Sequence, residues 1–397
     1  DRQENGIMEG DFIKINKWLL PLSKLYGLGV GIRNHLFNIG LLKSRSFKIP
    51  IISVGNITVG GSGKTPHVEY LINLLQDKVS KVAVLSRGYK RKSKGFVLAS
   101  DDTTMSQIGD EPYQMKQKFP NIYVAVDKDR CHGIDQLTQD EVAKDTEVIL
   151  LDDAFQHRYV SPGINILLVD YHRLIIYDRL LPAGRLREPQ KEKVRADIVI
   201  ITKCPPDLKA INYRVLKNAM NLYPYQDLFF TTLEYCNLKA IFDSREKELE
   251  SIKELHVMLL TGIASPRQMI IDLEDKCADI MPLTFPDHHN FKRKDIERIN
   301  ETFAAIPEPK IIITTEKDAT RLTNIEDLSA EVKENIFTLP IKVKFMLDME
   351  EKFNEKIISY VRKNSRNSIL AKGKDDHKPK NRNNSGNGIR TISFRNN

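Results

Sequence analysis

The stretch "SVGNITVGGSGKTP", residues 53–66, decides the fold of this 397-residue chain. The aliphatic run 50–55 predicts a buried strand, and "HVEYLINLL" at 67–75 predicts a helix because its apolar residues share one helical face. Between them lie three glycines within four positions, followed by Lys64 and Thr65. A strand, a glycine-rich loop and a helix in this order predict a phosphate-binding loop. Its backbone N–H groups and helix N-terminus hold an anion.

Each residue of this loop has a predicted role in nucleotide binding. Lys64 would reach the β- and γ-phosphates and act in catalysis, and Thr65 would ligate Mg²⁺. Position 58 is Thr where the strict pattern has Gly, so we expect the remaining glycines to supply the curvature. The predicted nucleotide-binding residues are Thr58, Val59, Gly60, Gly61, Ser62, Gly63, Lys64 and Thr65.

A second motif, "TEVILLDDAFQH" at 146–157, predicts a buried strand that ends in two carboxylates. Asp152 and Asp153 would lie at the strand end, where open α/β sheets bind their ligands. We expect them to hold Mg²⁺ or its water shell, with one of the two available to face the substrate. On this stretch alone, a polar strand end closed by an Asx-turn remains the alternative.

The pattern of strands and helices predicts an α/β fold. Further aliphatic runs lack polar alternation, as strands buried on both faces do; they lie at 81–85, 121–126, 164–169 and 197–202. They predict a doubly wound, P-loop NTPase-like parallel sheet. A second, smaller α/β domain is expected from the strands 256–261, 310–315 and 336–345, with helices near 265–275 and 293–305.

The two ends of the chain differ from the body in composition. Residues 12–48 contain seven Lys or Arg and no Asp or Glu, and their apolar runs are too short to span a bilayer. Such a basic segment with Trp and Leu suits the membrane interface, although a helical hairpin packed on the core is the alternative. The tail from 364 is predicted to be disordered. It carries most of the net charge of +8, so the charge is weak evidence for nucleic acid.

Eight short runs keep a fixed order between about 45 and 325: "SVGNITVGGSGKTP" (53–66), "LSRGYKRKSKG" (85–95), "GDEPYQM" (109–115), "VDKDR" (126–130), "DDAFQHR" (152–158), "LLPAGRLREP" (180–189), "FPDHHNF" (285–291) and "TTEKDATRL" (314–322). Together they resemble the tetraacyldisaccharide 4'-kinase family, which phosphorylates the lipid A precursor. The sequence departs from the family at Arg185, where Pro is commoner, and at Ala154-Phe155, where Gly-Leu is commoner. Neither change removes a catalytic group.

The resemblance implies roles for residues that the sequence alone would place in helix starts and turns. It makes Asp110 the base that accepts the proton of the sugar 4'-hydroxyl. It pairs this Asp with a histidine of the second domain, His288 in preference to His289. It also places several residues near the substrate: Glu111, Gln156, His157, Arg187 and Glu188. Lys317 and Asp318 could face the nucleotide. The alternative for His288 is a turn residue. Surface salt bridges remain the alternative for Gln156, His157, Arg187, Glu188, Lys317 and Asp318.

The predicted function is an ATP- and Mg²⁺-dependent kinase acting on the 4'-hydroxyl of an acylated glucosamine disaccharide, at the cytoplasmic face of the inner membrane. A membrane-associated P-loop ATPase switch and a soluble small-molecule kinase are the alternatives. We expect no nucleic-acid partner, and no protein partner is inferred. The predicted divisions are an extension (1–11), a membrane-interface segment (12–48), a kinase core (49–227), a two-stranded linker (228–242), a second domain (243–363) and a disordered basic tail (364–397).

Overall fold

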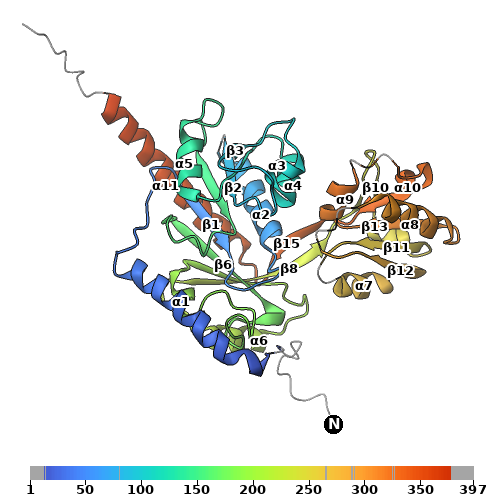
Figure 1. Ribbon diagram of the computed structural model, residues 1–397, viewed down its shortest axis with the longest axis horizontal. Coiled ribbons are helices and arrows are strands. Elements are labelled where there is room, and N and C mark those ends of the chain that lie inside the picture. The colour runs from blue at the N-terminus through green and yellow to red at the C-terminus, as the bar shows by residue number, and fades with distance from the viewer. Residues whose placement is uncertain are drawn as a thin grey trace, which may run out of the picture.

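The computed structural model describes residues 13, 15–79, 81–263, 266–287, 289, 291–323, 325 and 327–376, with side chains as far as 365. The chain forms a larger α/β domain around a nine-stranded sheet and a smaller one around a six-stranded sheet (Figure 1).

The large sheet places the phosphate loop at its centre. The strand order is β15-β8-β7-β6-β1-β5-β2-β4-β3, and only the two edge strands are antiparallel. β1 pairs with β5 from Ile51↔Ile149 to Val54↔Asp152, so the loops after these two strands open side by side. The strands are β1 Ile51–Gly55, β2 Val82–Ser86, β3 Val97–Leu98, β4 Tyr123–Val126, β5 Val148–Asp152, β6 Ile164–Asp170, β7 Ile198–Thr202, β8 Asp227–Tyr235 and β15 Ile341–Phe345.

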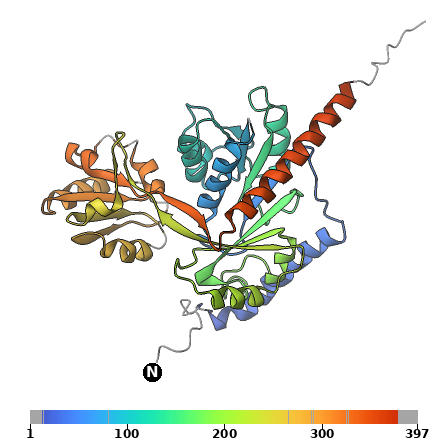
Figure 2. The same cartoon turned by 180° about the vertical axis from the view of Figure 1, so that it is seen from behind.

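Helices cover both faces of this sheet, as the non-alternating aliphatic strands require. One face packs against α2 (Lys64–Gln76), α4 (Asp110–Lys118) and α11 (Glu350–Asp376). Figure 2 shows α11 lying across the sheet from behind. The other face packs against α5 (Arg130–Gln139) and α6 (Ala210–Met220), and α1 (Leu20–Asn38) lies on that side. The shorter elements are η1 Lys17–Leu19, α3 Met105–Ile108, η2 Tyr171–Arg173 and η3 Gln190–Arg195.

The smaller domain has its own core on both faces of its sheet. The strand order is β10-β9-β14-β13-β11-β12, and the four strands from β14 to β12 are parallel. Its strands are β9 Leu238–Ala240, β10 Glu246–Lys247, β11 His256–Thr261, β12 Asp279–Thr284, β13 Lys310–Thr314 and β14 Ile336–Thr338. Its helices are η4 Leu249–Ile252, α7 Arg267–Glu274, α8 Arg293–Ala304, α9 Glu316–Leu322 and α10 Ala330–Asn335.

The link between the domains differs from the prediction for 228–242. Two strands were expected within this stretch, but β8 pairs instead with β15, from Tyr235↔Ile341 to Thr231↔Phe345. β9, the second strand of the stretch, belongs to the smaller sheet. Both strands form, but their predicted pairing with each other is wrong, because an apolar run shows that a strand forms without showing which distant segment pairs with it.

The end of the chain returns to the first domain, so the predicted second domain at 243–363 is too long. The side chains of Phe353, Ile357 and Val361 pack in the cluster that contains Ile52 and Val54 of the phosphate-loop strand. Helix α11 also continues to Asp376, so the disordered tail does not begin at 364. Residues 377–397 lie outside the described part.

The basic N-terminal segment forms one helix, α1, preceded by the short turn η1, and not a hairpin. None of the helices in the described ranges is long and apolar enough to cross a membrane.

Candidate active site

The phosphate loop is held in shape by side chains around it. The buried Asn56 amide donates to Ser62 Oγ at 2.7 Å, and Thr202 Oγ1 donates to the Ser62 carbonyl at 2.9 Å. Gly63 adopts a φ of 80° immediately before α2, a conformation that costs a glycine little. The helix therefore begins at Lys64 with its N-terminal N–H groups on the loop, which is the geometry of an anion site.

His67 fastens this helix start to the neighbouring strand β8. Its Nδ1 lies 2.7 Å from the Gly63 carbonyl oxygen, and its Nε2 lies 3.0 Å from Thr231 Oγ1. A carbonyl only accepts, so Nδ1 carries the proton and Nε2 accepts from the Thr231 hydroxyl. Burial lowers the pKa of His67 to about 4, which keeps the imidazole neutral and both bonds intact. The sequence analysis missed this residue.

The two carboxylates after β5 differ in their surroundings. Asp152 is buried, and its Oδ1 has no hydrogen-bond partner among the described residues. Burial, followed by the nearby charges of Glu111 and Asp153, raises the pKa of Asp152 to about 7. A buried carboxylate oxygen without a donor is a position that a cation would satisfy.

Asp153 is paired with cations instead. Its Oδ1 lies 3.7 Å from Lys64 Nζ and 3.2 Å from Arg187 Nη2. Burial alone would raise the pKa of Asp153, but Lys64 and then Arg187 hold it below its usual range. The chain at Asp153 has a φ of 47°, so the two successive carboxylates point in different directions.

Arg187 lies against the phosphate loop. Its Nη2 donates to the Asn56 carbonyl at 3.3 Å and also to the Asn56 side-chain oxygen. It therefore joins the loop to Asp153. The next residue, Glu188, is buried and pairs with Arg195, whose Nη1 also donates to the Phe155 carbonyl at 2.7 Å. Burial raises the pKa of Glu188.

Gln156 and His157 follow the carboxylates and keep unused hydrogen-bonding capacity. The Nε2 atoms of both side chains are buried without a partner in the described ranges. Burial, followed by the charge of Arg130, lowers the pKa of His157 to about 4. Neutral, inward-facing donors and acceptors of this kind fit the recognition of a polar, uncharged group.

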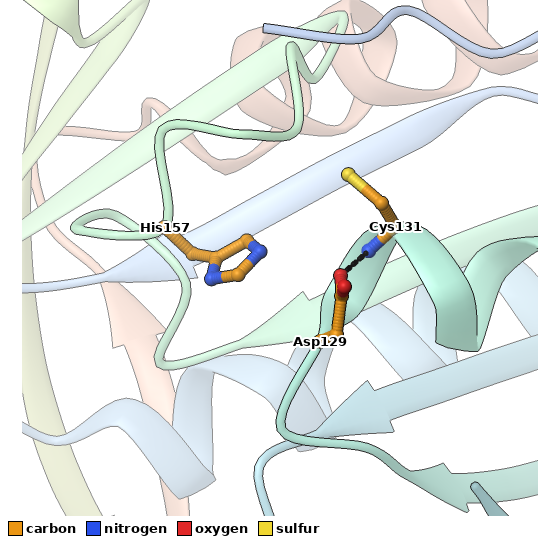
Figure 3. A group of neighbouring side chains, drawn as sticks. All are labelled: Asp129, Cys131 and His157. Atoms are coloured by element: carbon orange, nitrogen blue, oxygen red, sulfur yellow. Dashed lines mark hydrogen bonds between the residues drawn. The ribbon is translucent and has the colours of Figure 1, made fainter. Parts of the chain in front are cut away.

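Figure 3 shows the His157 ring turned toward Asp129 and Cys131. The ligand-type atoms of the three side chains lie within 4.8 Å of one another. However, Asp129 Oδ1 already accepts from the Cys131 N–H at 2.9 Å as the cap of α5, and the charges of Arg130, Arg33 and Arg87 act on His157. These cations oppose the binding of a metal ion at this position.

Asp110 begins α4, as its sequence context predicts, but its carboxylate reaches the other domain. It forms an ion pair with the Arg321 guanidinium of α9. The Arg321 side chain is only 4% exposed, and its Nη1 lies 3.1 Å from the fully buried Asp318 carboxylate. Glu111 acts on Asp152 through its charge, so it lies on the carboxylate side of the site.

The remaining predicted residues of the second domain have different placements. His288 lies outside the described residues. His289 Nε2 donates to the Asp295 carboxylate at 2.9 Å, and the ring stacks on Phe285, which makes His289 part of the local packing. Lys317 Nζ lies 3.2 Å from Asp287 Oδ1.

Asp318 does not face a nucleotide, because its side chain is fully buried in the second domain. Its Oδ2 accepts from the Gly262 N–H at 2.9 Å and from the Thr315 hydroxyl at 2.7 Å, while Oδ1 meets Arg321. Asp318 therefore orients Arg321. In the sequence, the only signal of the Asp318–Arg321 pair is the motif "TTEKDATRL", which contains both residues.

Comparison with known proteins gives consistent matches. A profile of the family described as tetraacyldisaccharide-1-P 4'-kinase matches residues 15–362. The tetraacyldisaccharide 4'-kinase of Phocaeicola vulgatus is 60% identical over 91% of this chain and 99% of its own length. That of Bacteroides fragilis is 53% identical over 94% of this chain and its own full length.

A solved structure is also similar. The crystal structure of the "apo" form of LpxK from Aquifex aeolicus in complex with ATP has a TM-score of 0.66 and 34% sequence identity. The similarity covers 87% of this chain and 98% of that chain, so it includes both domains.

Proposed function

Because this chain belongs to the tetraacyldisaccharide-1-P 4'-kinase family, we propose that its phosphate loop binds ATP and that Asp110 activates the acceptor hydroxyl. The family, the α/β fold and the kinase activity predicted from the sequence are confirmed. The enzyme is an ATP-dependent kinase that phosphorylates the 4'-hydroxyl of an acylated glucosamine disaccharide in lipid A biosynthesis. An ATPase switch and a small-molecule kinase are therefore excluded.

The nucleotide would lie on the loop between β1 and α2. The eight residues from Thr58 to Thr65 form the loop after β1 and the first residues of α2, and the related Aquifex protein was crystallised in complex with ATP. Lys64 is the first residue of α2, and its Nζ lies 3.7 Å from Asp153 Oδ1. In the complex its ammonium group would offset charge on the transferring phosphoryl group.

The carboxylate edge fits a magnesium ion. Asp152 has a buried oxygen without a donor and a raised pKa, and both features are those of a carboxylate that lacks its cation. We assign Asp152 and Thr65 as the residues that would hold Mg²⁺, with Asp153 at the same edge. The ion would supply positive charge to the phosphate oxygens.

Asp110 is proposed as the general base. Its carboxylate would accept the proton of the 4'-hydroxyl while Arg321 keeps it oriented. A strong base is not needed in kinases, because positioning and electrostatic stabilisation do most of the work. The pairing of Asp110 with His288 remains a proposal from the family resemblance.

We place the enzyme at the cytoplasmic face of the inner membrane. Helix α1 exposes Leu22 (54%) and Leu25 (66%), and the turn η1 that precedes it exposes Trp18 (93%). On its other side Ser23 Oγ donates to the Leu180 carbonyl at 2.9 Å, and the Tyr26 hydroxyl donates to the Arg187 carbonyl at 2.9 Å. The proposed membrane helix is thus bonded to the segment that carries Arg187.

The lipid substrate supports the same location. Each acyl CH₂ removed from the bilayer costs about 0.8 kcal/mol, so a multiply acylated sugar stays in the membrane. The enzyme must therefore reach the headgroup at the surface.

The observation that carries the proposal is the convergence of Lys64, Asp152 and Asp153 on one phosphate loop. It is tested by measuring the transfer of label from γ-labelled ATP to the acylated disaccharide, once with Mg²⁺ present and once with Mg²⁺ chelated. We expect transfer that requires both Mg²⁺ and the lipid. Rapid ATP turnover without the disaccharide would contradict the proposal.

A further inference from the structure

Helix α6 carries exposed apolar side chains that no described part of the chain covers. Ile211 and Val215 lie one turn apart and are 60% and 47% exposed. The turn after the helix adds Tyr223 and Tyr225, whose rings stack with centroids 5.7 Å apart and which are both about half exposed. Isolated apolar residues are normal on a surface, but an exposed apolar pair on a helix, followed by two exposed and stacked tyrosines, indicates an interaction surface.

The charge of this segment indicates what it contacts. Residues 208–226 contain no Asp or Glu, and their three basic side chains, Lys209, Arg214 and Lys217, are exposed. Basic side chains beside exposed aliphatic ones suit an anionic lipid surface. Tyrosines are enriched at the membrane–water interface, because one end of the ring is apolar and the hydroxyl is polar. The acid-free composition is the same as that of residues 12–48.

Helix α6 packs against the same segment of the chain, 180–186, that α1 contacts. Both views show the two helices at the same end of the large domain, with α1 nearer the viewer in Figure 1 and α6 nearer in Figure 2. Leu216 and Met220 of α6 are buried in the hydrophobic cluster that includes Leu186. Leu180 packs against this cluster, and its carbonyl accepts a hydrogen bond from Ser23 of α1. The outward sides of both helices therefore face away from the sheet.

We propose that α6 and the Tyr223–Tyr225 turn form a second membrane-contact element, which inserts into the headgroup region of an anionic bilayer beside α1. This inference rests on the proposed membrane location of α1. One helix lying in the interface leaves the domain free to rotate about the helix axis, whereas a second contact fixes the tilt. A fixed tilt would hold the segment 180–187 at a constant height above the lipid headgroups.

Fluorescence tests the proposal directly, because Trp18 is the only tryptophan of the sequence. In the full chain, the fluorescence of Trp18 reports the environment of the start of α1. In the double variant Trp18→Phe, Tyr223→Trp, the fluorescence reports the environment of the turn after α6. We expect both proteins to show a blue shift with vesicles of phosphatidylcholine and phosphatidylglycerol, and quenching by brominated lipid. The matched control is Trp18→Phe, Val142→Trp, because Val142 is 65% exposed and follows α5, which Figure 1 shows at the other end of the domain from α6. It should show neither effect.

The outcomes separate this inference from the proposed location. If Trp18 responds to vesicles and the tryptophan at position 223 does not, α6 is no membrane contact, while the location of α1 stands. If neither responds, both proposals are wrong. If the tryptophan at position 223 is shifted without lipid and sedimentation shows a dimer, a second copy covers α6 and the inference is overturned.

Charge reversal gives an independent measurement. Arg214→Glu, Lys217→Glu should weaken binding to anionic vesicles by roughly tenfold to thirtyfold, since each cation near an anionic surface contributes about fivefold. The control Arg293→Glu, Lys294→Glu makes the same charge change on exposed residues of α8 and should leave vesicle binding unchanged. Equal losses in the two pairs would attribute the effect to net charge and overturn the proposal.

Discussion

The nucleotide half and the acceptor half of the active site are built in opposite ways. The phosphate loop is braced by Asn56, Thr202 and His67, all within the first domain. The proposed base, Asp110, is held by Arg321 of the second domain, which β8 and β15 join to the first. The nucleotide half is therefore formed before ATP binds, whereas the acceptor half depends on the relative position of the two domains. Damage to the first should affect nucleotide chemistry, and damage to the second should affect acceptor activation.

The largest expected effect is in the nucleotide half. Lys64→Ala should lower kcat by roughly 10³-fold or more, because the phosphoryl group in transfer loses its nearest cation. The measurement is label transfer to the acylated disaccharide, with folding checked by thermal unfolding. Lys344→Ala, which removes an exposed lysine of β15, is the matched control and should retain full activity. Substantial activity in folded Lys64→Ala protein would disprove the assignment of the phosphate loop.

Asp152→Asn should lower kcat by roughly 10²-fold at low Mg²⁺, with part of the loss recovered at high Mg²⁺, since one ligand of the ion is lost. The exposed Asp101→Asn is the control. A loss that no concentration of Mg²⁺ changes would remove Asp152 from the metal site.

The same carboxylate predicts a pH dependence. The pKa of Asp152 is raised from its unfolded value to about 7, so the stability that it contributes is present at low pH and lost as pH rises through about 7. Mg²⁺ binds the ionised form, so it should raise the unfolding temperature more at pH 8 than at pH 5.5. Asp152→Asn should abolish this difference.

A smaller effect is expected at the contact between the halves. Arg321→Ala should lower kcat by roughly tenfold to a hundredfold while the Kd of Mg-ATP stays unchanged, because Asp110 loses its orienting partner. Thermal unfolding should show a loss of about 3–5 kcal/mol, since the buried Asp318 charge is left unpaired. Arg293→Ala on the surface of α8 controls for charge. An equal loss of Mg-ATP affinity would show that Arg321 belongs to the nucleotide half.

The smallest effect concerns the bracing of the loop. His67→Leu should destabilise the protein by about 1–3 kcal/mol at pH 7, because the Gly63 carbonyl and Thr231 hydroxyl lose their partner. The pKa of His67 is lowered to about 4 in the folded state, so its contribution is present above the unfolded pKa and is lost as pH falls toward 4. The difference between wild type and variant should shrink over this range. A difference that is constant with pH would show that packing alone is involved.

The nucleotide half was also the half that the sequence predicted well. The strand before Asn56, the loop and the helix from Lys64 are neighbours in the chain, and their local pattern is sufficient to identify them. The strand ending at Asp152 was predicted for the same reason. The side chains that brace the loop were not, because His67 meets Thr231 across a long separation in sequence.

The acceptor half could be reached only through the family resemblance. Nothing near Asp110 indicates that its partner is Arg321, and the run 228–242 does not show that β8 pairs with β15. Likewise, the apolar residues of α11 gave no sign that they cover the first domain and not the second. Long-range pairing depends on packing between segments, which periodicity does not encode.

The most direct test of the division into two halves is to measure, for Asp110→Asn, both kcat with the acylated disaccharide and the Kd of Mg-ATP by calorimetry. We expect kcat to fall by roughly 10²- to 10⁴-fold, the usual size of a general-base effect, while the Kd stays within about threefold of wild type. Asp243→Asn, in an exposed ion pair of the second domain, should change neither value. If Asp110→Asn weakens Mg-ATP binding as much as it lowers kcat, or if added Mg²⁺ restores its activity, Asp110 belongs to the metal site and the division is wrong.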